Sequence, residues 1–184
     1  MSTMVANLLT AEEFRLAPDN GLPVELVNGV VVEMSLPTPR HGQICAKATR
    51  LLGNFADEND FGHVVSNDAA VITRRGPDTV RGPDVAYYSY QRVPRGPLPI
   101  GYIDVPPELA VEVRSRSDRW PLILQKVGEY LNTGVALVCV LDDETATAFL
   151  YSIERAPRTV TNDSELDLSE MLPGFRVPLR RFFE

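Results

Sequence analysis

Two acidic residues stand in short apolar segments, where a carboxylate is costly unless it has a partner. Asp84 follows Gly82-Pro83 at the start of an apolar run, and Glu112 stands inside the run from Leu109 to Val113. Burying an unpaired carboxylate costs free energy, so such acids usually pair with a cation or bind a metal ion. Carboxylates at the ends of two neighbouring strands would form an oxygen site suited to Mg²⁺, which can polarise a phosphoryl oxygen and activate water. Asp84 and Glu112 therefore predict a divalent-metal site.

A cation follows these acids in the next predicted helix. Lys126 stands fourteen residues after Glu112, at the edge of an apolar stripe and close to Tyr130. From there its ammonium group can lean back toward the sheet, position a water molecule or offset developing charge. Each residue alone also has an ordinary explanation. Pro83-Asp84 could simply form a turn, Glu112 could stand at a strand edge or an interface, and Lys126 could lie on a solvated helix face. The order of the three residues is what favours one shared site.

The elements that must position these residues alternate between helices and short strands. The pattern predicts helices starting near residue 11, running from Pro39 to about residue 60, and running from 118–121 to Gly134. It predicts strands at 24–27, 30–34, 63–66, 70–73, 84–88, 109–113, 136–141 and 146–151, and a strand with a last amphipathic turn in the tail. Asn28-Gly29 predicts a tight hairpin turn. The strand, helix and strand from 109 to 141 form a crossover unit, so we expect those two strands to be parallel. The predicted class is α/β or α+β, with a mixed sheet and a helix on each side.

Composition limits the alternatives. The 184 residues fit one domain, and 44% hydrophobic with 23% charged residues is typical of a folded globular protein. No apolar run approaches a membrane span, and the N-terminal segment lacks the basic region of a signal peptide, so we expect a cytoplasmic protein. Cys45 and Cys139 form no Cys-x-x-Cys motif, and we expect both to be reduced and buried. The net charge is −7, yet residues 74–126 carry nine Lys/Arg against six Asp/Glu, which leaves room for a basic face that touches nucleic acid or for a merely solvated basic surface.

Several short segments match one known superfamily in order and spacing over nearly the whole chain. They are Glu25-Leu26-Val27-Asn28-Gly29, Pro37-Thr38-Pro39-Arg40-His41, Gly82-Pro83-Asp84-Val85, Pro107 to Ser115, Lys126 with Tyr130, Gly134-Val135, Asp142, and Leu172-Pro173-Gly174-Phe175. On these segments the chain resembles the PD-(D/E)XK nuclease superfamily, and most closely its Uma-two branch of restriction endonuclease-like proteins.

The resemblance implies a restriction-endonuclease-like mixed β-sheet core flanked by helices, formed by residues 1–184 as a single domain. It implies hydrolysis of phosphodiester bonds in nucleic acid, with DNA as the expected substrate, Mg²⁺ or Mn²⁺ as cofactor, and a homodimer. Asp84 and Glu112 match the metal ligands, and Lys126 matches a catalytic lysine displaced from the strand to the following helix. Glu25 and His41 match an upstream glutamate and histidine that line the same cleft.

The sequence also departs from the pattern of this branch. Arg114 stands two residues after Glu112, where most of the superfamily has lysine. It could contact a substrate phosphate or take over the role of the cation, although arginine cannot act as a base. Leu122 replaces a common aspartate, and Leu137-Val138-Cys139 replaces a common Glu-Tyr-Trp segment, so a reduced or altered activity stays open.

Two other functions remain compatible with the sequence. The same fold could bind nucleic acid or a partner protein without cutting, with the carboxylates holding a structural ion or pairing with Arg114 and Lys126. The chain could also be a dimeric protein with no role on nucleic acid. No helix-turn-helix, zinc finger or other base-reading module is visible. Residues 91–107, with five prolines and two glycines, predict a surface loop and are the expected place for any base-reading contact.

Overall fold

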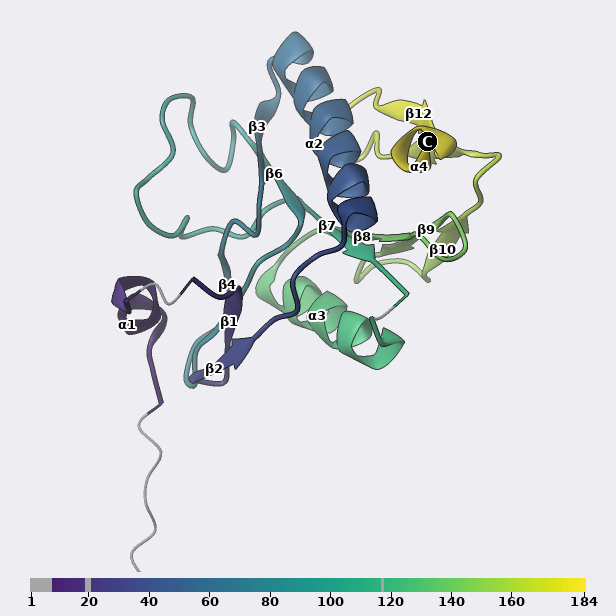
Figure 1. Cartoon of the computed structure of the whole chain (residues 1–184). Helices are drawn as coiled ribbons and strands as arrows, with labels where there is room; N and C mark the ends of the chain where they lie inside the picture. The colour runs from purple at the N-terminus through teal and green to yellow at the C-terminus, as the bar shows by residue number, and fades with distance from the viewer. Residues whose placement is uncertain (1–7, 19–20, 117) are drawn as a thin grey trace, which may run out of the picture.

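A computed structural model describes residues 8–18, 21–116 and 118–184 (Figure 1). The helices are α1 (Ala11–Leu16), α2 (Pro39–Asn59), α3 (Trp120–Thr133) and α4 (Arg180–Phe183). The strands are β1 (Val24–Val27), β2 (Val30–Glu33), β3 (Gly62–Ser66), β4 (Val71–Arg74), β5 (Thr79–Arg81), β6 (Val85–Ser89), β7 (Leu109–Arg114), β8 (Leu137–Asp142), β9 (Thr147–Tyr151), β10 (Arg158–Val160), β11 (Glu165–Asp167) and β12 (Arg176–Pro178).

The strands form one large sheet and two small ones. The large sheet has the order β10-β9-β8-β7-β6-β3, the second has the order β2-β1-β5-β4, and β11 pairs with β12. Strands β7 and β8, which α3 connects, are parallel as the crossover pattern predicts, while the other pairs of the large sheet are antiparallel. The expected mixed sheet is therefore confirmed.

Helices α2 and α3 cover opposite faces of the large sheet (Figure 1). Alternation along β7 turns Leu109, Val111 and Val113 toward the core beneath α2, and Ala110 toward the core beneath α3. Glu112 shares the face of Ala110, so its side chain is directed at α3. The strand period therefore aims one buried acid at the helix that carries Lys126.

Local sequence signals begin and end these elements as expected. The Thr10 hydroxyl accepts a hydrogen bond from the Glu13 N–H in a capping box at α1, and the Thr38 hydroxyl accepts one from the His41 N–H at the start of α2. Asn28 and Gly29 both have positive φ in the β1–β2 turn, and Gly134 ends α3 in the left-handed conformation.

Some predictions about the elements were incomplete or wrong. The pattern missed β5 and β10, each three residues long, and it predicted one strand in the tail where β11 and β12 pair. The apolar residues of 120–131 predict a buried stripe that includes Leu124, but Leu124 is 46% exposed because α3 turns Ile123, Val127 and Tyr130 to the sheet. Residues 90–108 contain no helix or strand, which confirms the predicted loop. In the described part of the chain, no helix combines the length and hydropathy that crossing a bilayer requires.

Asp78 attaches α1 to the smaller sheet. Its Oδ2 accepts hydrogen bonds from the Ala11 N–H and the Arg75 guanidinium, each at 2.8 Å, and its Oδ1 accepts one from the Gly76 N–H at 3.1 Å. The hydrogen bond from Ala11, followed by those from the other two groups, lowers the pKa of Asp78. Because the carboxylate is 8% exposed, its removal leaves these donors without their acceptor.

Asp78→Ala is therefore expected to lower the free energy of unfolding by about 1–3 kcal/mol near neutral pH. A lowered pKa gives a contribution that is present above the ordinary value of about 3.9 and is lost as the pH falls through the folded-state pKa. Urea unfolding should thus show the difference from the parent shrinking toward about pH 2. The control is Asp104→Ala, which removes an exposed acid that has no hydrogen bond or ion pair within the described residues. A constant difference at all pH values would contradict this account.

Candidate active site

The buried acid of β7 meets the predicted cation of α3. Glu112 is 4% exposed, its Oε1 accepts a hydrogen bond from the Tyr130 hydroxyl at 2.8 Å, and its Oε2 lies 3.5 Å from Lys126 Nζ. The same ammonium lies 2.9 Å from Glu25 Oε1. The structure thus brings Glu25, Glu112 and Lys126 together, and the lysine does lean back from its helix to the sheet.

Asp84 adjoins this group from the start of β6. Its Oδ2 accepts a hydrogen bond from the Val113 N–H at 2.7 Å, which holds the carboxylate beside the residue that follows Glu112. Its Oδ1 lies 3.4 Å from His41 Nε2 and accepts a hydrogen bond from the Cys45 thiol at 3.3 Å. His41 and Cys45 stand one turn apart near the start of α2. All five residues predicted as catalytic therefore lie in one connected cluster.

The electrostatics of the cluster follow from four crowded carboxylates. Burial, opposed by Lys126 and assisted by Asp84, raises the pKa of Glu112 to about 7. Partial burial and the charge of Asp84 raise the pKa of Asp68, in the turn before β4. Burial works against the charge of Lys126, but the carboxylates of Glu112 and Glu25 outweigh it and raise the pKa of this ammonium. The hydrogen bond with Asp84 raises the pKa of His41. The site is thus a cluster of acids around a lysine that stays protonated at neutral pH.

A buried arginine supports the cluster from the smaller sheet. Arg81 of β5 donates to Glu25 Oε2 at 2.7 Å and to Glu129 of α3 at 2.5 Å, and the Gly82 N–H donates to Glu25 Oε1 at 3.2 Å. These contacts fix Glu25, which comes from β1, against Lys126. The strand that the pattern missed therefore joins the small sheet to the site.

Arg114 lies outside the cluster. Its guanidinium donates to Asp142 Oδ1 at 2.6 Å and to Glu144 Oε2 at 3.1 Å. The guanidinium also lies over the Trp120 ring, with Arg114 Cζ 5.0 Å from the ring centre. The side chain shares a strand face with Glu112, but it faces the first turn of α3 and the β8–β9 turn. A contact with phosphate stays a prediction for Arg114, and the structure gives this residue a full set of other partners.

Three members of the site escaped sequence reasoning. Cys45 was expected to be buried among apolar groups, as Cys139 is, but it is only partly buried and contacts both His41 and Asp84. The signal available was its position four residues after His41 on one helix. Asp68 follows Asn67 in a turn where both residues have positive φ. Because aspartate is common in such turns, its presence in the sequence indicates only a turn. Arg81 stands in a strand too short to be predicted from alternation.

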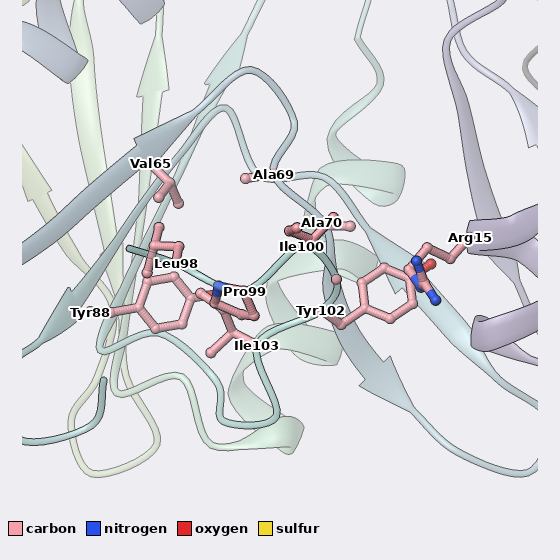
Figure 2. Close-up of a pocket in the computed structure, with 11 residues that line it drawn as sticks. Arg15, Val65, Ala69, Ala70, Tyr88, Leu98, Pro99, Ile100, Tyr102 and Ile103 are labelled. Carbon is pink, nitrogen blue, oxygen red and sulfur yellow. The ribbon is translucent and has the colours of Figure 1, made fainter. Parts of the chain in front are cut away.

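An apolar hollow lies outside this cluster. It has a volume of about 360 Å³ and lies where residues 98–103 fold over β3 and β6 (Figure 2). Arg15 and Tyr102 stand at one end of it, and Tyr88 and Leu98 at the other. None of the residues predicted as catalytic lines it, so the loop predicted to read bases forms an apolar hollow that these side chains do not share.

Comparisons with known proteins bear on the family and the fold of this chain. The family model Uma2, described as "Putative restriction endonuclease", matches residues 11–180. A solved structure, described as "a putative nuclease belonging to DUF820 from Anabaena variabilis ATCC 29413", matches with a TM-score of 0.79 at 16% sequence identity. The match covers 95% of this chain and 97% of that chain. None of the curated proteins matches. The structural match confirms the restriction-endonuclease-like fold class.

Proposed function

We propose a nuclease activity for this chain because it belongs to the Uma2 family, whose model matches residues 11–180. The proposed function is divalent-metal-dependent endonucleolytic hydrolysis of phosphodiester bonds, with DNA as substrate. The observation that carries it is the meeting of Glu112 from β7 with Lys126 from α3, at 3.5 Å, next to Asp84. A strand acid and a helix lysine here form the acid–cation pair that the sequence order predicts.

The donor set of the site fits a hard divalent cation. Glu25, Asp68, Asp84 and Glu112 supply four carboxylates, while Lys126 is the cation among them and Arg81 is already divided between Glu25 and Glu129. Burial is the main cause that raises the pKa of Glu112 and of Asp68, and the neighbouring negative charge of Asp84 adds to it in both. Oxygen ligands are the ones that Mg²⁺ and Mn²⁺ prefer. Asp84 and Glu112 are the proposed ligands.

The residues around the metal ligands have separate tasks in this proposal. A bound Mg²⁺ or Mn²⁺ would supply Lewis acidity toward the phosphodiester and its attacking water. Lys126 stays protonated at neutral pH because its pKa is raised, so it serves as a hydrogen-bond donor and positive charge rather than as a base. Glu25 holds Lys126 in place through the 2.9 Å contact, with Arg81 behind it. His41 orients the Asp84 carboxylate or a water molecule near it.

A cleavage assay with plasmid DNA, linear duplex, single-stranded DNA and RNA tests the proposal. Each substrate is incubated with the parent in Mg²⁺, in Mn²⁺ and in EDTA, and with Asp84→Ala under the same conditions. We expect metal-dependent cleavage of DNA by the parent and none by Asp84→Ala, while Asp104→Ala cleaves as the parent does. Equal cleavage by the parent and Asp84→Ala would overturn the assignment. Stabilisation by the metal without cleavage of any substrate would favour the non-cleaving binding module.

The homodimer implied by the resemblance and the cytoplasmic location expected from the composition stay predictions. Light scattering at several protein concentrations measures the first, and fractionation of cells measures the second. The contact of Arg114 with substrate phosphate is likewise a prediction.

A further inference from the structure

Three different metal-binding side chains converge beside the carboxylate cluster. Cys45 Sγ lies 3.4 Å from His41 Nδ1 and 3.3 Å from Asp84 Oδ1, and His41 Nε2 lies 3.4 Å from that same oxygen. One ligand atom from each residue can be chosen so that all lie within 4.8 Å of one another. The thiol has no role in the proposed hydrolysis, so its place between an imidazole and a carboxylate requires its own explanation.

The backbone holds this arrangement without help from a ligand. His41 and Cys45 stand at i and i+4 on α2, and residues so spaced lie on one helix face. Asp84 is fixed by the Val113 N–H from the neighbouring strand. The side chains of His41 and Asp84 keep 17% and 12% of their surface exposed, so an ion can reach them from solvent. The three groups are therefore preorganised and accessible.

The spacing fits zinc. Zinc–ligand bonds of about 2.0–2.3 Å in a tetrahedral arrangement place neighbouring ligand atoms roughly 3.3–3.8 Å apart. The contact of Cys45 Sγ with Asp84 Oδ1 at 3.3 Å falls at this spacing, as does the 3.4 Å contact made by whichever ring nitrogen of His41 binds. The remaining pair lies within 4.8 Å, so a small rotation of one side chain completes the set. Thiolate and imidazole ligands favour zinc over magnesium, which takes oxygen ligands. Three protein ligands also leave one tetrahedral position for water or a phosphate oxygen.

We propose that His41, Cys45 and Asp84 form a zinc site at the edge of the active site. Cys45 binds as the thiolate and releases its proton to solvent, while His41 binds through one ring nitrogen. Asp84 belongs both to this site and to the proposed magnesium site, so zinc bound here competes with or adjoins the magnesium ion. The inference does not require nuclease activity, because binding is measured without nucleic acid.

Metal titration of the purified chain tests the site directly. Zn²⁺ affinity is measured by competition with a chromogenic chelator, and Co²⁺ serves as a spectroscopic probe whose thiolate charge-transfer band reports coordination by cysteine. We expect the parent to bind a single zinc ion and to show the band. Cys45→Ala should lose the band and bind Zn²⁺ at least about 10-fold more weakly, and His41→Gln should also bind it more weakly. Cys139→Ala, which removes the fully buried cysteine, should match the parent.

A further variant separates this proposal from the proposed nuclease function. Glu112→Gln removes a proposed magnesium ligand but none of the zinc ligands, so it should keep the cobalt band and the zinc affinity. A parent without the band, or a band that persists in Cys45→Ala, overturns the zinc site whatever the cleavage assay shows. Should Cys45→Ala fail to fold, as judged by circular dichroism, loss of zinc affinity in His41→Gln decides the question.

Discussion

Glu112→Gln is expected to lower metal-dependent cleavage about 100- to 10,000-fold without lowering the stability of the fold at neutral pH. The substitution keeps the shape of the side chain and an oxygen that can accept the hydrogen bond of the Tyr130 hydroxyl. It removes the negative charge that a divalent cation needs. Lys126 keeps its 2.9 Å contact with Glu25, so the ammonium is not left unpaired.

The pH dependence of stability should change in the same variant. Burial raises the pKa of Glu112 to about 7, whereas the unfolded chain ionises this group near its ordinary value of about 4.3. The folded state therefore holds the proton more tightly, so this contribution to stability is fully present below about pH 4.3 and is lost as the pH rises through about 7. Urea unfolding of the parent should show that decline, and Glu112→Gln should reduce it.

The matched control is Glu108→Gln, which changes a partly buried acid of the same kind outside the cluster. Its carboxylate accepts hydrogen bonds from Ser89 and pairs with Arg92, so this variant is expected to lose stability yet cleave as the parent does per folded molecule. Two results would contradict the proposed role of Glu112. One is cleavage by Glu112→Gln at the parental rate, and the other is an unchanged Mg²⁺ affinity of this variant in calorimetry.

The sequence was enough to predict the parts of the site that follow from periodicity. The two-residue period of β7 and the helical period of α3 place Glu112 and Lys126 on facing surfaces. The crossover connection through α3 makes β7 and β8 parallel. Contacts between segments that lack such a period could not be predicted from the sequence. Arg81 reaches Glu25 and Glu129 from a three-residue strand, and Asp68 approaches the site only because Gly82 lets the two turns touch, since a Cβ at Gly82 would lie 2.7 Å from Asp68 Cβ.

Arg114 shows that the face of a strand alone does not identify all the neighbours of a side chain. Residues i and i+2 of a strand share a face, so the pattern put Arg114 near Glu112 and suggested phosphate as its partner. In the parallel pairing of β7 with β8, however, Arg114 stands opposite Asp142, an acid that is 1% exposed. The position along the strand, and not only the face, decides which partner a charged side chain meets.

Arg114→Ala is accordingly expected to destabilise the fold by about 3–5 kcal/mol, because it leaves the Asp142 carboxylate buried without its cation. Thr145 and the Glu144 N–H still donate to Asp142, but neither carries a charge. Arg176→Ala, which breaks an exposed ion pair with Asp167, should cost no more than about 1 kcal/mol. Urea unfolding of the two variants gives the comparison.

The same variant decides between the two roles of Arg114 once cleavage and DNA binding are measured per folded molecule. A residue that only stabilises the β8–β9 turn leaves DNA binding and its dependence on salt unchanged. A residue that contacts phosphate weakens binding and lowers the slope of log affinity against log salt by about one. Because the guanidinium is 7% exposed and already bonded to Asp142 and Glu144, we expect the first result. A lower slope together with a small loss of stability would show that these ion pairs open to admit the substrate.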